Sequence, residues 1–442
     1  MSDLFAIGAS GIKAYSRALS VVGDNIANAQ TEGYVRRTVR LQEAPPAGDI
    51  VLSRNSIRPG GVTAAGVTRE LDQWLVEDAR TSSGEAARQS TRLNWISITE
   101  RSLANGGDSI NGSISAVFAT ADQLSATPND PNLRRQFLAN VNDSAGTFRR
   151  TANALGSALD GVAVEARGSV DQLNTDLNAL SRVNEGLSRA RPGSTNEATL
   201  LDERDRVTES IASMMEIAVS YDARGIAAVR SASGDILVGG NEVATIGLAV
   251  SEGGLLSFTL NQANLFQPMS GELAGLADAA THISNNIAGL NALAEQFSST
   301  LNAAHEAGLD ANGAAGLPLL NFTGAAAELV AFARAIAQVA TANTTSNNGN
   351  MLAFNNLRGA NGIEQNVIAF ITQQAQATAA ARAQEAASSG RRQSALAARD
   401  AIGGVDLDRE ATDLLRFQQA YEAAARTIQV ARETMQTMLN IF

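Results

Sequence analysis

Residues 405–442 read VDLDREATDLLRFQQAYEAAARTIQVARETMQTMLNIF. Apolar side chains recur in this stretch at alternating spacings of three and four residues, which is the pattern of a helix whose a and d positions face a partner helix. This C-terminal stripe consists of Leu414, Phe417, Tyr421, Ala424, Ile428, Ala431, Met435, Met438 and Phe442. The spacing predicts one long helix that buries its stripe against another helix.

The N-terminal segment carries the same pattern. Its N-terminal stripe consists of Phe5, Gly8, Ile12, Tyr15, Leu19, Val22 and Ile26. An isolated helix of this length is marginal in water, so we expect the two terminal helices to pair with each other or with copies of themselves. An ordinary two-helix contact inside one domain would give the same spacing, so the stripes alone leave both readings open.

Residues 25–37, NIANAQTEGYVRR, follow the N-terminal stripe and are rich in poor helix formers. They predict that the first helix ends here, with Gly33 in the left-handed conformation of a C-cap and Asn28 in a turn. Asn25 and Asn28 flank Ile26, and polar residues at a helix seam can fix its register. The motif Asn25, Asn28, Thr31, Gly33 and Tyr34 therefore marks the point where the chain leaves the terminal helices.

Long helices are also predicted between the two ends. One begins near Arg69 and runs towards Leu103. Another has Asp130 as its N-cap and Pro131 as its first residue, and it continues to about Arg189. The second half of that helix carries a further apolar stripe of Val170, Leu173, Leu177, Leu180, Asn184 and Leu187.

After that helix the residue pattern changes from helical to strand-like and then back to helical. Ser194 and Glu197 have the spacing of a capping box at the start of the next helix. Residues 216–262 then alternate apolar and polar positions with glycine-rich turns, which predicts a small antiparallel β unit. Helix returns with a stripe at Leu273, Leu276, Ala280, Ile283, Ile287, Leu290, Ala294, Phe297 and Leu301, and again over residues 361–398.

The chain is therefore predicted to be mainly α, with long helices in a coiled-coil-like bundle, paired terminal helices and a small inserted antiparallel β domain. Outer helices enclose inner helices, which enclose the β segment, so the domains are nested and discontinuous. We expect a terminal coiled-coil assembly domain that is disordered in the monomer, a helical middle domain and an outward β domain, at residues 1–44 plus 394–442, 45–215 plus 266–393, and 216–265 respectively.

Composition narrows the class of protein. The 442 residues carry a net charge of −11 and a pI of about 4.9, which argues against nucleic acid as a partner. The chain has no cysteine, so disulfides and thiolate metal sites are excluded. No stretch of 18 apolar residues predicts insertion into a membrane, and the first twenty residues lack the features of a cleaved secretory signal.

Candidate catalytic groups are sparse. His282 and His305 are 23 residues apart with no metal-binding spacing, and each is interpreted as a surface or half-buried helix histidine. The run Asp202 to Arg206 predicts ion pairs on a solvated helix face. Residues 308–316, GLDANGAAG, lack the ligand spacing of a calcium loop. We therefore predict no catalytic, cofactor-binding or metal-binding residues, and a protein that is not an enzyme.

The two ends together resemble the axial proteins of the bacterial flagellum, the group of rod, hook and hook-associated proteins. The resemblance rests on the Asn25-Ile26-Ala27-Asn28 motif with Thr31, Gly33 and Tyr34, and on residues 405–408, VDLD, followed by Glu410 and Gln418–Tyr421. Within this group the middle of the chain resembles the hook-associated protein 1 (FlgK) family. The matching stretches are LLDERD at 200–205, HEAGLD at 305–310 with Asn312-Gly313, and PNDPNLRRQFL at 128–138.

This resemblance implies a structural subunit at the junction of hook and filament, in which folding of the terminal helices is coupled to polymerisation. It implies copies of itself in a helical ring or tube, hook protein on one side, and another junction protein or flagellin on the other. It also implies flagellar type III export without a cleaved signal peptide, a cytoplasmic export chaperone at the C-terminal segment, and an extracellular location. Enterobacterial members are longer, and only the polar loop at 341–350 occupies the place of their extra outward domain.

Three alternatives stay open on the sequence. A hook or rod subunit would share both terminal motifs, although LLDERD and the long helical middle favour the hook-associated family. A cell-wall hydrolase fused to an axial module would need an acid pair that the sequence does not suggest. A cytoplasmic coiled-coil scaffold would need only the stripes.

Overall fold

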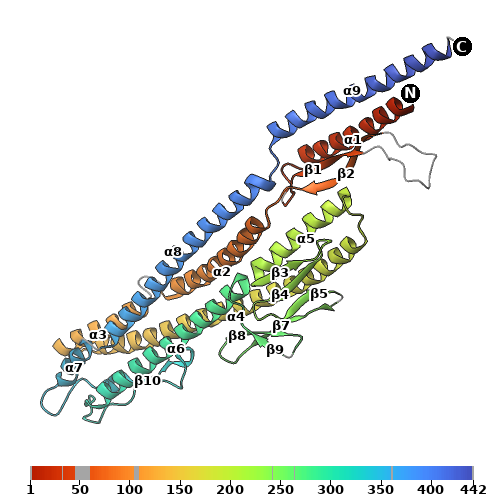
Figure 1. Cartoon of the computed structure of the whole chain (residues 1–442). Coiled ribbons are helices and arrows are strands. Elements are labelled where there is room, and N and C mark those ends of the chain that lie inside the picture. Colours follow the sequence, from red (N-terminus) through yellow and green to blue (C-terminus); the bar gives the residue numbers. More distant parts are fainter. Residues whose placement is uncertain are drawn as a thin grey trace. The chain divides into compact units, whose positions relative to one another are not determined.

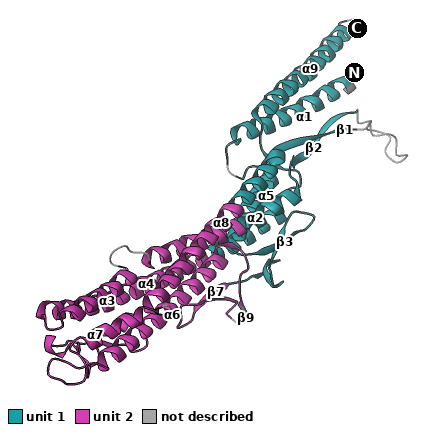
Figure 2. Cartoon of the chain, turned by 90° about the vertical axis from the view of Figure 1, so that its left-hand side faces the viewer, with its two compact units in different colours: residues 1–84, 172–245, 389–442 teal, residues 85–171, 246–388 magenta. Residues whose placement is uncertain are grey.

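The computed structural model describes residues 2–31, 33–44, 60–103, 109–240, 242–262, 264–359 and 362–440 (Figure 1). Within these residues the fold is mainly helical with small antiparallel sheets, as predicted. The chain divides into two compact units, which Figure 2 shows in different colours. Unit 1 comprises residues 1–84, 172–245 and 389–442, and unit 2 comprises residues 85–171 and 246–388.

Unit 1 combines the two ends of the chain with part of its middle. Its elements are α1 (Ser2–Ala27), β1 (Arg37–Ala44), β2 (Gly61–Arg69), the start of α2 (Gln73–Leu103), the end of α4 (Pro131–Arg189), α5 (Thr195–Met214), β3 (Ile217–Tyr221), β4 (Ala227–Ser231), β5 (Ile236–Gly239), β6 (Glu242–Val243), the end of α8 (Ile363–Gly403) and α9 (Leu407–Leu439). Three separate stretches of sequence therefore contribute to one unit, and the fold is discontinuous.

A β-hairpin lies beside α1 in unit 1. Strands β1 and β2 pair antiparallel along their whole length, with a bulge at Arg40 and Leu41. Gly66 and Gly193 meet backbone to backbone, and the Val67 amide donates to the Gly193 carbonyl at 2.9 Å. A Cβ atom on either glycine would come within about 3 Å of the other, so this contact requires two glycines. The sequence patterns described above did not predict β1.

Unit 2 is a helical bundle around an aromatic core. It contains the rest of α2, α4 and α8 with α3 (Ile110–Ala126), α6 (Gly271–Glu306) and α7 (Gly349–Phe354), strands β7 (Ile246–Val250), β8 (Leu256–Leu260), β9 (Asn264–Phe266), β10 (Leu320–Asn321) and β11 (Val330–Ala331), and the short 3₁₀ helices η1 (Ala326–Glu328), η2 (Ile336–Gln338) and η3 (Asn355–Arg358). Phe148 of α4 stacks on Phe297 of α6 with ring centroids 5.6 Å apart, and Phe137 meets Phe354 edge-on at 5.9 Å. Such pairs add specific geometry to burial.

The predicted apolar stripes of the inner helices are confirmed. All six stripe residues of α4 are buried, and so are all those of α6 except the half-buried Ile287. Asn184, the polar member of the α4 stripe, donates to the Ala227 carbonyl and accepts from the Ala227 amide at 2.8 and 2.9 Å. Because the oxygen and the nitrogen of its amide are both bonded to Ala227, the first residue of β4, burial of the Asn184 side chain costs little free energy.

The predicted caps are also confirmed. The Asp130 carboxylate accepts from the Asn132 amide at 2.7 Å, directly before Pro131 opens α4. The Ser194 hydroxyl accepts from the Glu197 amide at 3.1 Å. Glu197 reaches back to the amide of Gly193 rather than to that of Ser194, so the reciprocal bond falls one residue earlier than in a capping box.

The β segment occupies the predicted residues but forms two sheets instead of one unit. One sheet has the order β3-β4-β5-β6 and belongs to unit 1, and the other has the order β7-β8-β9 and belongs to unit 2. The first sheet ends at β6, which contains only two residues, and the second sheet begins with the next strand, β7. The division into terminal, middle and outward β domains stays a prediction.

His282 is half-buried, as predicted, but His305 is entirely buried in unit 2, so the prediction of a surface or half-buried side chain is wrong for His305. Its Nε2 accepts from the Ala340 amide at 2.9 Å, so its Nδ1 carries the proton and donates to the Leu317 carbonyl at 2.7 Å. Burial lowers the pKa of His305, Arg334 lowers it further, and the bond to Leu317 opposes the shift. Protonation of Nε2 would break the bond from Ala340.

We predict that unit 2 loses stability on acidification. His305 has a folded pKa below its ordinary value of 6.5, so the unfolded chain binds more protons between the two values, and the free energy of unfolding falls as the pH drops below about 6.5. Replacing His305 with glutamine should cost about 1–3 kcal/mol near neutral pH and should reduce the further loss between about pH 7.5 and 5.5 in urea unfolding. An unchanged acid-induced loss in the variant would show that His305 is not responsible.

Candidate assembly site

Helices α1 and α9 pair antiparallel along their apolar stripes (Figure 1). Gly8 lies against Ile428, and the Tyr15 and Phe417 rings lie 6.5 Å apart. Because the residue number rises along α1 as it falls along α9, the two helices run in opposite directions. A Cβ atom on Gly8 would lie 2.6 Å from Ile428 Cγ1 and 3.2 Å from the Ala424 carbonyl oxygen, so glycine permits this close approach.

The structure divides the N-terminal stripe between two surfaces. Gly8 and Val22 are buried and Tyr15 is half-buried. Residues outside the predicted stripe are buried as well: Gly11 lies against Ala424 of α9, Asn25 bonds to Glu410 of α9, Val21 packs with Val67 of β2 and Ala198 of α5, and Ala14 and Ala18 are also buried. The other four stripe residues are spaced by seven: Ile12 and Leu19 are half-buried, and Phe5 and Ile26 are 50% and 39% exposed. Helix α1 packs against both α9 and the hairpin. The buried face of α1 is therefore broader than the face of a two-helix contact, and it is rotated about the helix axis from the predicted stripe.

The C-terminal stripe is buried only in part. Ala431 is buried, and Leu414, Phe417, Ala424 and Ile428 are half-buried. Tyr421, Met435 and Met438 are 37%, 57% and 50% exposed, and Phe442 lies outside the described residues. Gly8 faces Ile428, so the helix beyond Met435, two turns later, extends past the start of α1. The apolar end of α9 thus has no α1 segment opposite it, as Figure 1 shows.

Asn25 forms a buried polar contact between α1, α9 and the hairpin. Its Nδ2 donates to Glu410 Oε2 and to the Arg37 carbonyl, both at 2.9 Å. Its Oδ1 accepts from the Tyr34 hydroxyl at 2.9 Å and from the Arg37 amide at 3.1 Å. All four hydrogen-bonding positions of the amide are therefore occupied at complete burial. Burial also raises the pKa of Tyr34 to about 12, so its hydroxyl stays protonated and able to donate.

Glu410 is the buried carboxylate of this contact. It is completely buried and pairs with Arg36 Nε at 2.6 Å. Arg36 also binds Glu70 at 2.6 Å and Asp413 at 3.0 Å. Burial alone would lower the pKa of Arg36, but the bonds to Glu70 and Glu410 outweigh it and raise the pKa. One arginine thus connects α9 with the residues on either side of the hairpin.

A second set of ion pairs joins the hairpin to α5. Asp202 binds Arg37 at 2.6 Å and Arg69 at 2.8 Å, and Asp205 binds Arg69 at 2.7 Å. The prediction that this acidic run forms pairs along one solvated helix face is wrong for both aspartates, since Arg37 and Arg69 are nearly buried and come from β1 and β2. Only the neighbouring Glu203 and Arg206 form the predicted exposed pair along the helix.

The other motif residues shape the end of α1. Asn28 donates to the Asp24 carbonyl at 2.8 Å and accepts from the Thr31 hydroxyl at 3.3 Å, so it does not reach α9 through these bonds. Gly33 has a φ of +76°, as predicted, but α1 already ends at Ala27. Gly33 is therefore part of the following turn and not the helix C-cap.

Sequence reasoning did not find the polar half of this site. Arg36, Arg37, Arg69, Asp202 and Glu410 are the residues that connect the elements. The available signal was that Arg36-Arg37 directly follows the NIAN motif and that an acidic run occurs in LLDERD. Neither signal specifies a partner, because the paired residues are up to 374 positions apart.

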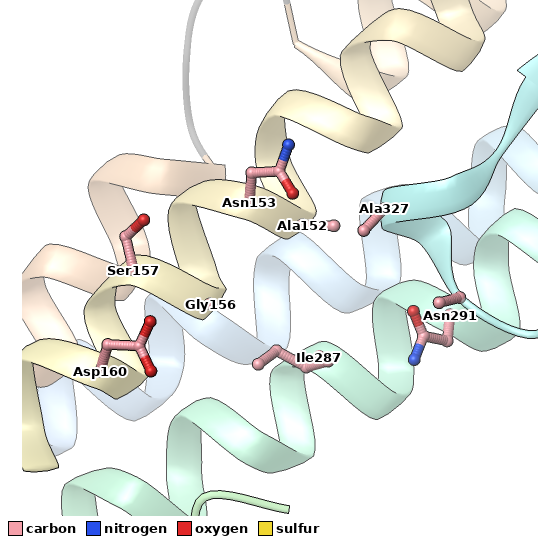
Figure 3. A pocket seen from close by; sticks show the side chains of 9 residues that line it. Ala152, Asn153, Gly156, Ser157, Asp160, Ile287, Asn291 and Ala327 are labelled. Carbon is pink, nitrogen blue, oxygen red and sulfur yellow. The ribbon is translucent and has the colours of Figure 1, made fainter.

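The described residues offer little that resembles an enzyme site. A shallow hollow in unit 2 lies between α4 and α6, with Asn153, Ser157 and Asp160 on one side and Ile287 and Asn291 on the other (Figure 3). Asp160 is its one carboxylate. Across the described ranges no three His, Cys, Asp or Glu side chains are placed to hold a metal ion. None of the helices in the described part of the chain is long and apolar enough to cross a membrane.

Comparison with known proteins agrees with the resemblance at the ends and in the middle. Residues 96–320, just over half of the chain, match the family model of the flagellar hook-associated protein FlgK helical domain. The chain belongs to the FlgK family. In this FlgK-family protein, residues 5–34 match the flagella basal body rod protein family and residues 402–441 match the flagellar basal body rod FlgEFG protein C-terminal family. It is therefore a structural protein of the external flagellum.

Several FlgK relatives align with it. Flagellar hook-associated protein 1 of Bacillus subtilis is 26% identical, covering 97% of this chain and 96% of that protein. The Salmonella typhimurium and Escherichia coli proteins of the same name are 26% and 24% identical, but the chain spans only 58% and 59% of their lengths. A solved structure of the flagellar hook junction protein FlgK from Burkholderia pseudomallei has a TM-score of 0.49 at 20% identity, over 55% of this chain and 46% of that one.

The close contact at Gly8 generates a prediction about α1. Gly8→Ala should destabilise the α1–α9 pair by about 1–3 kcal/mol, because the new methyl group meets Ile428. Gly23 on the same helix has nothing within 4 Å of its Cβ position, so Gly23→Ala should stabilise α1 by about 0.5–1 kcal/mol. Hydrogen exchange of the α1 amides in assembled flagella measures both effects, and equal effects at the two glycines would contradict the observed packing.

Asn25 and Asn28 provide a matched pair for the polar contact. Asn25→Leu removes the buried bonds of Asn25 to Glu410, Arg37 and Tyr34 and should cost about 2–4 kcal/mol in urea unfolding of unit 1 in assembled flagella. Asn28→Leu loses bonds near the surface and should cost less than about 1 kcal/mol. If the two substitutions cost the same, Asn25 does not hold α1, α9 and the hairpin together.

Proposed function

We propose that this chain is a subunit of the hook–filament junction, assembled when the terminal helices of neighbouring copies cover the apolar surface that one chain leaves exposed. The observation that supports this most directly is the state of the two stripes. Within one chain they pair with each other, yet Phe5, Ile26, Tyr421, Met435 and Met438 stay substantially exposed. Soluble monomers rarely expose so many large apolar side chains on one pair of helices.

Exposed and half-buried apolar residues recur along each helix of the pair. On α1 the exposed Phe5 and Ile26 and the half-buried Ile12 and Leu19 are spaced by seven residues, and on α9 the exposed Leu407 and Tyr421 and the half-buried Leu414 have the same spacing. A seven-residue spacing places side chains along one side of a helix. The Leu407 and Leu415 side chains of α9 are 53% and 59% exposed. A helix of a second copy can bury this stripe, as a third helix does in a bundle.

Folding and assembly are coupled in this proposal. An isolated helix pair with such an incomplete seam gains little from burial, so we expect the terminal segments to be disordered before assembly and ordered by their neighbours. A contact of one surface with a different surface of the next copy produces a ring or helical tube. The predicted register role of Asn25 fits here, because its bonds to Glu410 and Arg37 fix how α1 lies on α9.

The neighbours in this proposal are hook protein on one side and another junction protein or flagellin on the other. The chain would reach them unfolded through the flagellar export channel without a cleaved signal peptide, and its C-terminal segment, which has an exposed apolar end, would bind an export chaperone in the cytoplasm. No catalytic step is part of the proposal. A hook or rod subunit is the alternative within the same group, and the match to the FlgK helical domain favours the junction.

The proposal predicts a single band of protein between hook and filament. Immunolabelling of intact cells should show this band, and in a null strain Phe5→Asp with Ile26→Asp should abolish it and reduce filament attachment at least tenfold. The paired control is Val164→Asp, which changes a 64% exposed apolar residue of unit 2 and should leave the band intact. Circular dichroism of the purified variants checks that the helical content is retained.

Label along the whole hook or in the basal body would contradict the junction and favour the alternative axial subunit. Normal filament attachment by the double aspartate variant would contradict the role of the exposed stripe.

A further inference from the structure

Trp74 is an exposed aromatic residue that the assembly of terminal helices does not explain. It lies in the first turn of α2, in unit 1, and its side chain is 85% exposed. The chain has only two tryptophans, and the other, Trp95, donates to Glu165 and packs on Gly161. Tryptophan is among the residues most enriched at the centres of protein interfaces. An exposed one in a chain with 4% aromatic residues therefore suggests a binding surface.

Acidic residues lie on both sides of Trp74 in the sequence, two of them before α2 begins and one within it. Glu70 precedes it by four residues, Asp72 accepts from its backbone amide at 2.8 Å, and Asp78 follows it by four. Residues four apart lie on one side of a helix, so Trp74 and Asp78 share a face. Asp72 and Asp78 are exposed, and in the described part of the chain Asp78 forms no ion pair. An aromatic ring next to free carboxylates is suited to bind a guanidinium, which stacks on the ring and pairs with the acid.

The chain supplies such a group elsewhere in unit 1. Arg391 and Arg392 are adjacent and exposed on α8, and among the described residues neither has a carboxylate partner. Arg36, Arg37 and Arg69 of the same unit, by contrast, are nearly buried and form ion pairs. Arginine also lies over an aromatic ring at five places within the described residues, among them Arg204 over Tyr221 at 4.1 Å. Trp74, the most exposed ring, lacks that contact in a single chain.

We propose that Trp74 and Asp78 of one copy bind the Arg391-Arg392 pair of a second copy of this chain. The two patches have opposite charge, they lie on different elements of the same unit, and each is incomplete alone. A contact between two different patches of one chain is heterologous and repeats from copy to copy. This inference rests on the proposed function, because it needs neighbouring copies, but it places a second contact outside the terminal helices.

The contact also adjoins the terminal helices. The Gly403 backbone lies against the Glu70 carbonyl, four residues before Trp74, and the Gly403 carbonyl oxygen accepts from the Arg36 amide at 2.8 Å. Ile402 and Leu407, on either side of the link between α8 and α9, are 45% and 53% exposed. An arginine bound at Trp74 would therefore lie beside the start of the α9 stripe, so both contacts form part of one continuous surface between copies.

Because the chain contains no cysteine, single cysteines can test the contact directly. Asp78→Cys and Arg392→Cys are produced separately and together in a null strain, and isolated flagella are treated with a short bismaleimide. The proposal predicts a cross-linked species of about twice 45.9 kDa only in cells that make both variants. Pairing Arg392→Cys with Ser157→Cys, an exposed position in unit 2, sets the level of random linking.

A second variant separates the aromatic contribution from proximity. Adding Trp74→Ala to the Asp78→Cys copy should reduce the cross-link about fivefold, which corresponds to ~1 kcal/mol, whereas Trp74→Tyr should retain most of it. Immunolabelling of the same cells shows whether the protein occupies the junction.

The outcomes are distinct. Labelled junctions without the mixed cross-link overturn this contact and leave the proposed function intact. Cross-links within either single-variant population would mean that like patches meet, and they overturn it as well. A mixed cross-link that Trp74→Ala does not weaken contradicts the role of the ring. Absence of the protein from the junction overturns the proposed function and this contact together.

Discussion

The buried contact of Glu410 with Arg36 and Asn25 is the interaction on which unit 1 depends. Glu410 lies at the first turn of α9, Asn25 at the last turn of α1, and Arg36 immediately before β1. A completely buried carboxylate is strongly unfavourable unless it is paired and hydrogen-bonded. Here both of its oxygens are bonded. The three segments must therefore come together in one arrangement, and α1 cannot slide along α9 without leaving a buried charge alone.

The hairpin extends this constraint from the terminal helices to α5. Arg36 and Arg37 are adjacent, and since they point to different partners, one binds Glu410 and the other binds Asp202. Arg69 returns from the second strand to the same aspartate. The close backbone contact of Gly66 with Gly193 lies beside these pairs. Movement of the helix pair would thus be transmitted to α5 through ion pairs that have little exposure.

The apolar residues of α1 and α9, unlike the polar contact, are only partly buried within one chain. Gly8 and Gly11 allow α1 and α9 to approach closely, and this narrow seam buries small side chains while larger ones stay on its edge. Phe5, Ile26 and Tyr421 are examples. The polar contact therefore determines how the two helices lie, and in the proposed assembly the exposed apolar edge is the surface that a neighbour would cover. Trp74 and the Arg391-Arg392 pair provide a second, charged set of groups in the same unit.

The sequence by itself determined the helical elements, the caps at Asp130 and Ser194, the position of the β segment and the family. Each of these depends on residues close together in the chain: spacings of three and four, a cap three residues from its amide, or a motif of a few residues. It did not determine that β1 pairs with β2, that the β segment forms two sheets, or which side of α1 is buried. It also gave no partner for Glu410, Arg36 or Asp202. The strand pairing and the buried side of α1 depend on packing between elements, and the partners of Glu410 and Asp202 lie more than a hundred residues away, so only the tertiary structure brings an asparagine at position 25 to a glutamate at position 410.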